Sequence, residues 1–192
     1  MLNYLNDIDT RVLLAINSMH SAFADKVMIL LSARGAWIPF YAVLLAIIII
    51  KFKWRSWLVL ITIALLITAS DRFTSGFMKP YFARLRPCHE EGLKNLLYLA
   101  DGCGGSYGFA SSHAANSFAA ATFLWLLLHK RIRWIGLLFP WAFMICYSRI
   151  YLGAHYPGDV LVGMLTGMSL GILFFKLYTL ADSKIAKPIK VG

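Results

Sequence analysis

Five apolar runs, separated by short polar stretches, account for most of the chain. They cover residues 36–50, 57–69, 114–128, 135–147 and 160–180. Some are shorter than the roughly 20 residues that cross a hydrocarbon core as a helix, but each can be extended through flanking small or polar residues. No run carries Lys, Arg or Glu near its middle. The pattern predicts an all-α integral membrane protein, a bundle of about five transmembrane helices.

Two of these runs carry further local signals. The residues after the second run continue its helical pattern, so we expect that helix to extend to Met78. In the fourth run Pro140 lies inside the apolar stretch, where it should kink the helix without breaking it.

A different periodicity precedes the first run. Apolar residues recur at steps of three and four at Leu2, Leu5, Ile8, Val12, Ile16 and Met19. This spacing predicts an amphipathic helix that lies in the membrane interface or packs beside the bundle, and a frayed terminus is the alternative. We therefore divide the chain into an N-terminal interfacial segment, residues 1–34, and a membrane-embedded domain, residues 35–192. Because the opening stretch lacks a cationic region and a small-residue cleavage site, we expect the first span to direct the chain to the membrane.

Composition agrees with a membrane protein. The chain has 192 residues, of which 59% are apolar and 15% charged, and its mean hydropathy is +0.66. These values favour membrane embedding over a soluble core. A formal net charge of +10 would suggest nucleic acid in a soluble chain, but here the cations lie between apolar runs, where they set topology. We expect the lipid bilayer as a partner, no nucleic acid, and no obligatory protein partner.

The distribution of cations also predicts the orientation. With five spans, the two chain termini lie on opposite sides of the membrane. One side holds the turns at residues 51–55 and 130–133 and the lysine-containing tail, all rich in Lys and Arg and almost free of acid. The positive-inside rule assigns that side, and with it the C-terminus, to the cytoplasm of what we expect to be a bacterial inner membrane. Residues 79–110 and 148–159 then form two loops on the extracytoplasmic, periplasmic face.

Polar residues suited to binding phosphate gather at the span ends on that face. Lys79, Arg86 and Arg149 supply three cations, two of them guanidinium forks that match phosphate geometry. Ser111 and Ser112 stand just before an apolar helix, where their hydroxyls and the amides of the first turn would bind an anion. Phosphoryl transfer needs mainly positioning and charge stabilisation. For any one cation, a snorkelling anchor is the alternative.

Two histidines and a carboxylate complete the candidate site. His155 is the candidate nucleophile, which would form a phosphohistidine, and Asp159 would hold its ring in one tautomer and stabilise its cation. His113 would protonate the leaving oxygen and then activate water. The sequence shows no cluster of ligands for a metal, so we expect no metal and no cofactor, with cations in the metal's place. Asp71 is interpreted as structural rather than catalytic.

The same residues form three motifs: Lys79-x6-Arg86-Pro87, Ser111-Ser112-His113 and Ser148-Arg149-x5-His155-x3-Asp159. They resemble the signature motifs of the type 2 phosphatidic acid phosphatase superfamily, which includes membrane lipid phosphatases, glucose-6-phosphatase and vanadium haloperoxidases. The second motif departs from the family's usual Pro-Ser-Gly-His, because this chain has Ala110 and Ser112 in place of Pro and Gly. The loop therefore lacks the preset φ of Pro and the freedom of Gly. The resemblance implies a membrane enzyme that hydrolyses phosphate esters without a metal, with the histidine and aspartate roles given above.

The resemblance leaves the substrate open. Five spans suggest a lipid tail that reaches the site laterally, and undecaprenyl diphosphate, lipid A, phosphatidylglycerol phosphate and phosphatidic acid all fit. We favour a polyprenyl diphosphate, because an outward-facing site suits the recycling of a lipid carrier. A small transporter or channel, a different class, should show repeated halves or mid-membrane charges, and the sequence has neither. Membrane embedding argues against a haloperoxidase, whereas a phosphatase for soluble substrates remains open.

Glycines and cysteines give two further expectations. Gly163, Gly167 and Gly171 recur at four-residue steps on one face of the fifth span, which favours close helix packing within the chain over dimerisation. Cys88 and Cys103 both fall in the first extracytoplasmic loop. Because that compartment is oxidising, we predict a disulfide between them; two unpaired, small apolar residues are the alternative.

Overall fold

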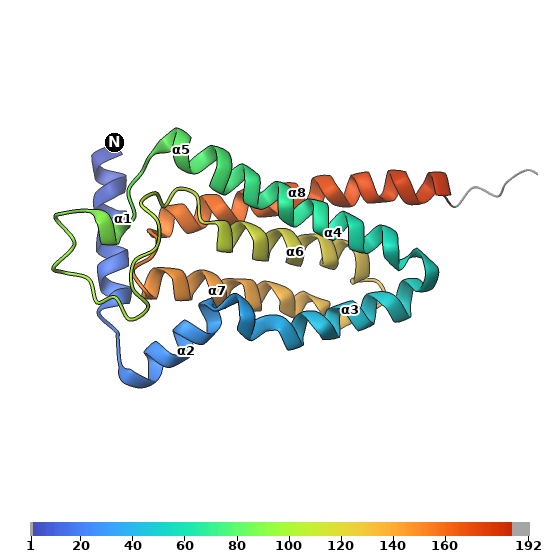
Figure 1. The fold of residues 1–192 in the computed structure, drawn as a ribbon, viewed down its shortest axis with the longest axis horizontal. Coiled ribbons are helices and arrows are strands. Elements are labelled where there is room, and N and C mark those ends of the chain that lie inside the picture. The colour runs from blue at the N-terminus through green and yellow to red at the C-terminus, as the bar shows by residue number, and fades with distance from the viewer. Residues whose placement is uncertain (1, 186–192) are drawn as a thin grey trace, which may run out of the picture.

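The computed structural model describes residues 2–185, which form a bundle of helices (Figure 1). The α-helices in chain order are α1 Leu2–Asn17, α2 Ala22–Ser32, α3 Ile38–Phe52, α4 Ser56–Asp71, α5 Lys79–Phe82, α6 Ser112–Leu128, α7 Leu138–Tyr151 and α8 Pro157–Ile185. Within this range the β-structure amounts to one isolated bridge, between Leu85 and Tyr107. The all-α fold predicted from the apolar runs is confirmed.

Helices α3, α4, α6, α7 and α8 lie where the five apolar runs predicted them. The expected extension of the second run is also present, because α4 continues through a π-helical stretch, Arg72–Met78, into α5. Among the described residues, two helical stretches are long and apolar enough to cross a membrane on their own, Arg34–Phe82 and Pro157–Ile185. The number of crossings therefore stays a prediction, as does the division of the chain at residue 34.

Pro140 was expected to kink the middle of a helix, but it lies near the start of one. Helix α7 begins at Leu138, after a short 3-10 turn, Arg133–Leu137. Pro140 therefore lies in the first turn of the helix, where the missing N–H has no carbonyl partner to lose. The apolar run extends across the turn and the helix, so hydrophobicity alone did not show where the helix starts.

Helix α6 is the centre of the bundle and is buried on almost every side (Figure 1). Four of its alanines, among them Ala115 and Ala119, have no exposed surface, and Ala115 and Ala119 lie against the glycine face of α8. A Cβ atom added to Gly163 would lie 2.5 Å from the carbonyl oxygen of Ser111, and one added to Gly167 would overlap the carbonyl oxygen of Ala115. The glycine face of α8 thus packs within the chain, as predicted.

Helix α1 lies across one end of the bundle (Figure 1). The side chains that it turns inward repeat every four residues: Leu13 and Asn17 are buried, and Asp9 is nearly so. Asn17 donates to the carbonyl oxygens of Tyr98 and Tyr151 at 2.8 and 2.7 Å and accepts from the Tyr98 amide at 2.9 Å. The helix is therefore fixed to the bundle by polar contacts.

The apolar stripe of α1 does not make this contact. Leu5, Ile8 and Val12, which defined the amphipathic pattern, remain exposed. The predicted helix is present and packs against the bundle. The part of the stripe from Leu5 to Val12 is exposed, whereas Ile16, nearer the end of the helix, packs against the core.

The contact between α6 and α8 yields a stability prediction. Gly167→Ala should destabilise the protein by about 1–3 kcal/mol, because the added methyl group meets a backbone atom that cannot rotate away. Gly76→Ala is the matched control, since a Cβ atom there has nothing within 4 Å. Thermal unfolding of both variants in detergent measures the difference. Equal melting temperatures would contradict the close packing.

Candidate active site

The functional residues predicted from the sequence meet at the end of the bundle that α1 covers. Helix α5 ends there, α6 and α8 begin there and α7 ends there, with the segment from residue 83 to residue 111 folded over them (Figure 1). Ser111 links two of these elements directly, because its amide donates to the carbonyl oxygen of Asp159 at 3.0 Å. The first turns of α6 and α8 are thus joined at the backbone.

His155 occupies the turn between α7 and α8 and is almost completely buried, with 1% of its surface exposed. The turn is shaped by Gly153, whose φ of +69° lies in the left-handed region that favours glycine. The His155 amide donates to the Arg149 carbonyl oxygen at 3.2 Å. Its Nδ1 atom lies 3.5 Å from Oδ2 of Asp159 and has no hydrogen-bond partner. The ring therefore faces the carboxylate without yet being bonded to it.

The charges of three cations act on His155, and two of these cations, Lys79 and Arg149, also act on His113. Burial lowers the pKa of His155 well below its ordinary value of 6.5, and the nearby charges of Arg86, Arg149 and Lys79 lower it further. His113 lies within electrostatic reach of both Arg149 and His155. The structure therefore brings the three predicted cations and both predicted histidines together, and it favours a neutral His155 ring.

The two arginines of the predicted site are held by neighbouring oxygens. Arg86 donates to the carbonyl oxygens of Tyr107 at 3.3 Å and Ala154 at 3.4 Å. Arg149 donates to the hydroxyl of Ser32 on α2, while its buried Nε has no partner. Each guanidinium is fixed by neutral groups, so its charge remains available for an anion.

The two serines before α6 differ in their surroundings. Ser111 is the N-cap residue, fully buried, and its hydroxyl has no partner. The hydroxyl of Ser112 instead accepts from Thr74 at 2.9 Å and lies 2.8 Å from the hydroxyl of Ser75. Ser111 thus offers a free hydroxyl, whereas the Ser112 side chain joins α6 to the π-helical stretch.

Two charged residues at this site were not predicted from the sequence. Arg84, inside the first motif, donates to Oδ1 of Asp159 at 2.8 Å and to Asp9 at 2.7 Å. Arg34 lies close enough for its charge to act on both His113 and Arg149. No local signal distinguishes them from other cations, because their partners lie far away in the sequence.

A disulfide joins Cys88 to Cys103, with their Cα atoms 5.9 Å apart. It closes the loop two residues after Arg86. His89 lies beside it, with Nε2 2.9 Å from the Gly104 carbonyl oxygen. Within the described range these three residues are the one group of His and Cys close enough to share a metal ion, but both sulfur atoms are used by the disulfide.

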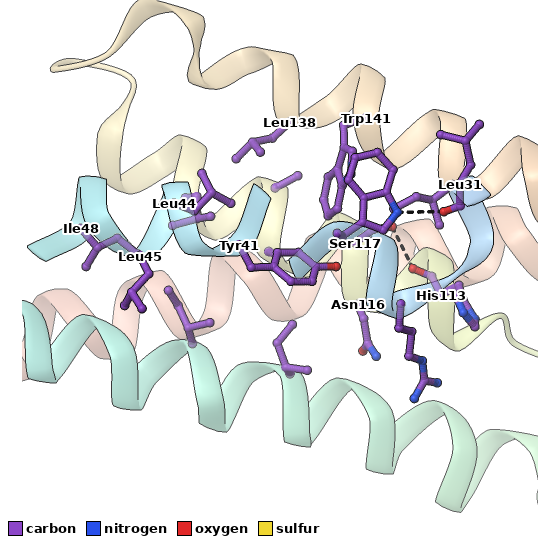
Figure 2. Close-up of a pocket in the computed structure, with 18 of the residues that line it drawn as sticks. Leu31, Tyr41, Leu44, Leu45, Ile48, His113, Asn116, Ser117, Leu138 and Trp141 are labelled. Atoms are coloured by element: carbon purple, nitrogen blue, oxygen red, sulfur yellow. Dashed lines mark hydrogen bonds between the residues drawn. The ribbon is translucent and has the colours of Figure 1, made fainter. Parts of the chain in front are cut away.

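A cavity of about 440 Å³ leads from the candidate site into the bundle (Figure 2). It runs between α3, α4, α6 and α7, with Ile48 and Leu45 near one end and His113 and Asn116 near the other. Its wall is mostly aliphatic and aromatic. A second, more polar cavity of about 300 Å³ shares Arg34, Ile67 and Asn116 with the first.

A buried histidine that faces a carboxylate and lies within the field of three cations is an arrangement suited to phosphoryl transfer, here set in a bundle of apolar helices. Residues 60–182 match the model of the PAP2 superfamily, so the chain belongs to that superfamily. The resemblance of its three motifs is thereby confirmed.

Comparison with individual proteins shows which members of the superfamily this chain resembles. Over 179 residues the chain is 42% identical to the lipid A 4'-phosphatase of Bacteroides thetaiotaomicron, covering 91% of this chain and 79% of that protein. It is 32% identical over 162 residues to the undecaprenyl-diphosphatase of Sulfolobus acidocaldarius, covering 82% and 72%. The crystal structure of a transmembrane PAP2 type phosphatidylglycerolphosphate phosphatase from Bacillus subtilis superposes with a TM-score of 0.69 at 21% identity, covering 98% of this chain and 90% of that one.

The chain is therefore a membrane lipid phosphatase. The preference for a polyprenyl diphosphate is not supported, since the more similar of the two relatives is named for lipid A. That preference rested on the direction in which the site faces, which does not distinguish among lipids of the outer leaflet. Lipid A, one of the alternatives, fits better.

The disulfide between Cys88 and Cys103 can be tested together with the predicted extracytoplasmic position of its loop. In unreduced, denatured protein, Cys146 should react with an alkylating reagent, whereas Cys88 and Cys103 should not. Mass spectrometry of the alkylated peptides measures this, with buried, unpaired Cys146 as the internal control. Cys88→Ala with Cys103→Ala should lower stability by ~3 kcal/mol, because a closed loop restricts the unfolded chain. Quantitative alkylation of all three thiols would contradict the extracytoplasmic placement of this loop.

Proposed function

We propose that this enzyme removes a phosphate group from lipid A at the extracytoplasmic face of the membrane, through a phosphohistidine on His155. The observation that carries the proposal is the buried pair of His155 and Asp159, whose facing atoms are 3.5 Å apart, beside Lys79, Arg86 and Arg149. The similarity to a lipid A 4'-phosphatase supports the choice of substrate.

The two cavities support a lipid with a polar head between its phosphate and its tails. Arg34, Asn116 and the apolar Ile67 line the wall that the apolar and the polar cavity share, and the buried Oδ1 of Asn116 has no partner. In a phosphorylated glycolipid, sugar hydroxyls would lie there while an acyl chain enters the apolar cavity (Figure 2). In a polyprenyl diphosphate the hydrocarbon starts directly at the phosphate, so these polar groups would be left unpaired.

The proposed reaction uses the groups in the positions described. Because Nδ1 of His155 faces Asp159, Nε2 is left to attack phosphorus, forming the N–P bond as the P–O bond to the sugar breaks. His113 gives a proton to the departing oxygen. The imidazolium that forms is stabilised by Asp159. His113 then takes a proton from water, which attacks the phosphohistidine and releases inorganic phosphate.

The cations and Ser111 would bind the non-reacting phosphate oxygens. Lys79, Arg86 and Arg149 oppose the charge that develops on these oxygens in the transition state. The unpartnered hydroxyl of Ser111, together with the first amides of α6, adds neutral donors. These groups would take the place that a metal ion holds in other phosphatases.

The substrate proposal is tested by phosphate release from purified lipids. The kcat/KM for lipid A should exceed those for undecaprenyl diphosphate and phosphatidylglycerol phosphate by about tenfold or more, because polar groups left unpaired by the other lipids weaken binding. A chelator should leave all rates unchanged. A higher kcat/KM for undecaprenyl diphosphate would reject lipid A as the preferred substrate, and loss of activity with chelator would reject the metal-independent site.

The histidine roles predict two different defects. His155→Ala should abolish turnover and the acid-labile phosphoenzyme, because the nucleophile is absent. His113→Ala should still form phosphoenzyme from a substrate with a good leaving group, since such a group departs without a proton, and should then hydrolyse it slowly. Rapid quenching with radiolabelled substrate measures both. Full activity in His155→Ala would contradict the nucleophile assignment.

A further inference from the structure

One carboxylate of the N-terminal helix reaches the active site. Oδ2 of Asp9 accepts from Nη2 of Arg84 at 2.7 Å, and its Oδ1 accepts from the Gly158 amide, in the first turn of α8, at 2.7 Å. The other terminal nitrogen of Arg84 donates to Oδ1 of Asp159 at 2.8 Å. Asp9, Arg84 and Asp159 thus form a continuous chain of ion pairs from α1 to the candidate site.

This chain is shielded from solvent. The exposed fractions of the side chains are 13% for Asp9, 25% for Arg84 and 0% for Asp159. The guanidinium also lies 4.1 Å from the centre of the Tyr156 ring, which adds a cation–π contact. Charges this well covered interact more strongly than an exposed ion pair. Nη2 of Arg84 also lies 3.5 Å from Oδ1 of Asn6, an exposed and longer contact, so Asp9, Asp159 and Tyr156 make the close contacts that fix Arg84.

The arrangement assigns a different task to each oxygen of Asp159. Oδ1 accepts from Arg84, while Oδ2 accepts from the Tyr156 amide at 3.1 Å and faces Nδ1 of His155 at 3.5 Å. Gly108 packs against the carboxylate of Asp159, since a Cβ atom added to Gly108 would lie 2.8 Å from Oδ2. The carboxylate can serve His155 only while Arg84 stays on the opposite oxygen.

We infer that Asp9 is a positioning residue for the active site: by holding one nitrogen of Arg84, it keeps that guanidinium from taking both oxygens of Asp159. Arginine readily binds a single carboxylate with two parallel hydrogen bonds. Without Asp9, the second nitrogen would turn to Oδ2 of Asp159 and compete with His155. The inference rests on the proposed role of His155, and it holds whichever lipid is the substrate.

The docking of α1 does not depend on Asp9 alone. Asn17, 2% exposed, fixes the other end of the helix through Tyr98 and Tyr151. Asp9→Asn should therefore leave α1 in place while it removes the charge that holds Arg84. The same helix offers a matched control in Asp7, which pairs with Arg11 at the surface, where both side chains are at least half exposed.

The experiment compares kcat and KM for Asp9→Asn, Asp7→Asn and Arg84→Gln in the full-length protein, with one lipid phosphate substrate. The expected kcat falls by about tenfold in Asp9→Asn and about a hundredfold in Arg84→Gln, because the carboxylate that orients His155 is misplaced. KM should change little, since the phosphate-binding cations are untouched, and Asp7→Asn should match the unaltered protein. The double variant should be no slower than Arg84→Gln alone, since both changes act through one contact.

Asn17→Ala, which loosens the other end of α1, distinguishes a positioning role of Asp9 from a purely structural one. If Asn17→Ala and Asp9→Asn lose equal kcat for equal loss of melting temperature, Asp9 only docks the helix and the inference is wrong. It is equally overturned if Asp9→Asn matches Asp7→Asn. An active His155→Ala variant would instead overturn the proposed mechanism, so the two failures are distinguishable.

Discussion

The close approach of α8 to α6 is the constraint on which the site depends. Gly163 lets the backbone of α8 meet the carbonyl of Ser111, and the amide of Ser111 donates to the Asp159 carbonyl oxygen. These contacts fix the first turns of both helices against each other. His113 stands one residue into α6, and His155 lies just before α8. A larger residue at the glycine would move the two histidines apart before it touched either of them.

The site also holds polar groups that the protein itself does not satisfy. Nδ1 of His155, Nε of Arg149 and the hydroxyl of Ser111 are all buried without a partner. Unpaired polar atoms of this kind are rare in folded proteins and each costs free energy. The charges of Lys79, Arg86 and Arg149 act on one of these groups, His155. A bound phosphate would satisfy the cations and the hydroxyl together, so the fold holds in advance the charges that the reaction needs.

Much of the fold and the predicted site could be read from the sequence because the signals are local. Apolar runs gave the main helices, and the spacing of His155 and Asp159 placed both at one helix start. Arg84 and Asp9 could not be found in this way, because they meet across 75 positions and no pattern near either one marks the pairing. The contacts of Ser112 could not be predicted for a similar reason, because its hydroxyl meets residues 37 and 38 positions away. In the proposed function the choice of lipid depends on cavity walls assembled from several helices far apart in the sequence, which no single segment reveals.

Helix α1 shows why hydrophobic periodicity must be interpreted differently in a membrane protein. In water the apolar face of a helix turns inward, and the stripe with Leu5 and Val12 would be expected to cover the bundle. At a membrane interface, where we predict α1 to lie, lipid can cover apolar side chains as well as the core does, so hydrogen bonds and charge have more weight in selecting the buried face. Asp9 and Asn17 lie on the inward face, and Leu13 is one position beyond Val12, a rotation of about 100° on a helix with 3.6 residues per turn. The few polar residues beside an apolar stripe therefore predict the contact face of such a helix better than the stripe does.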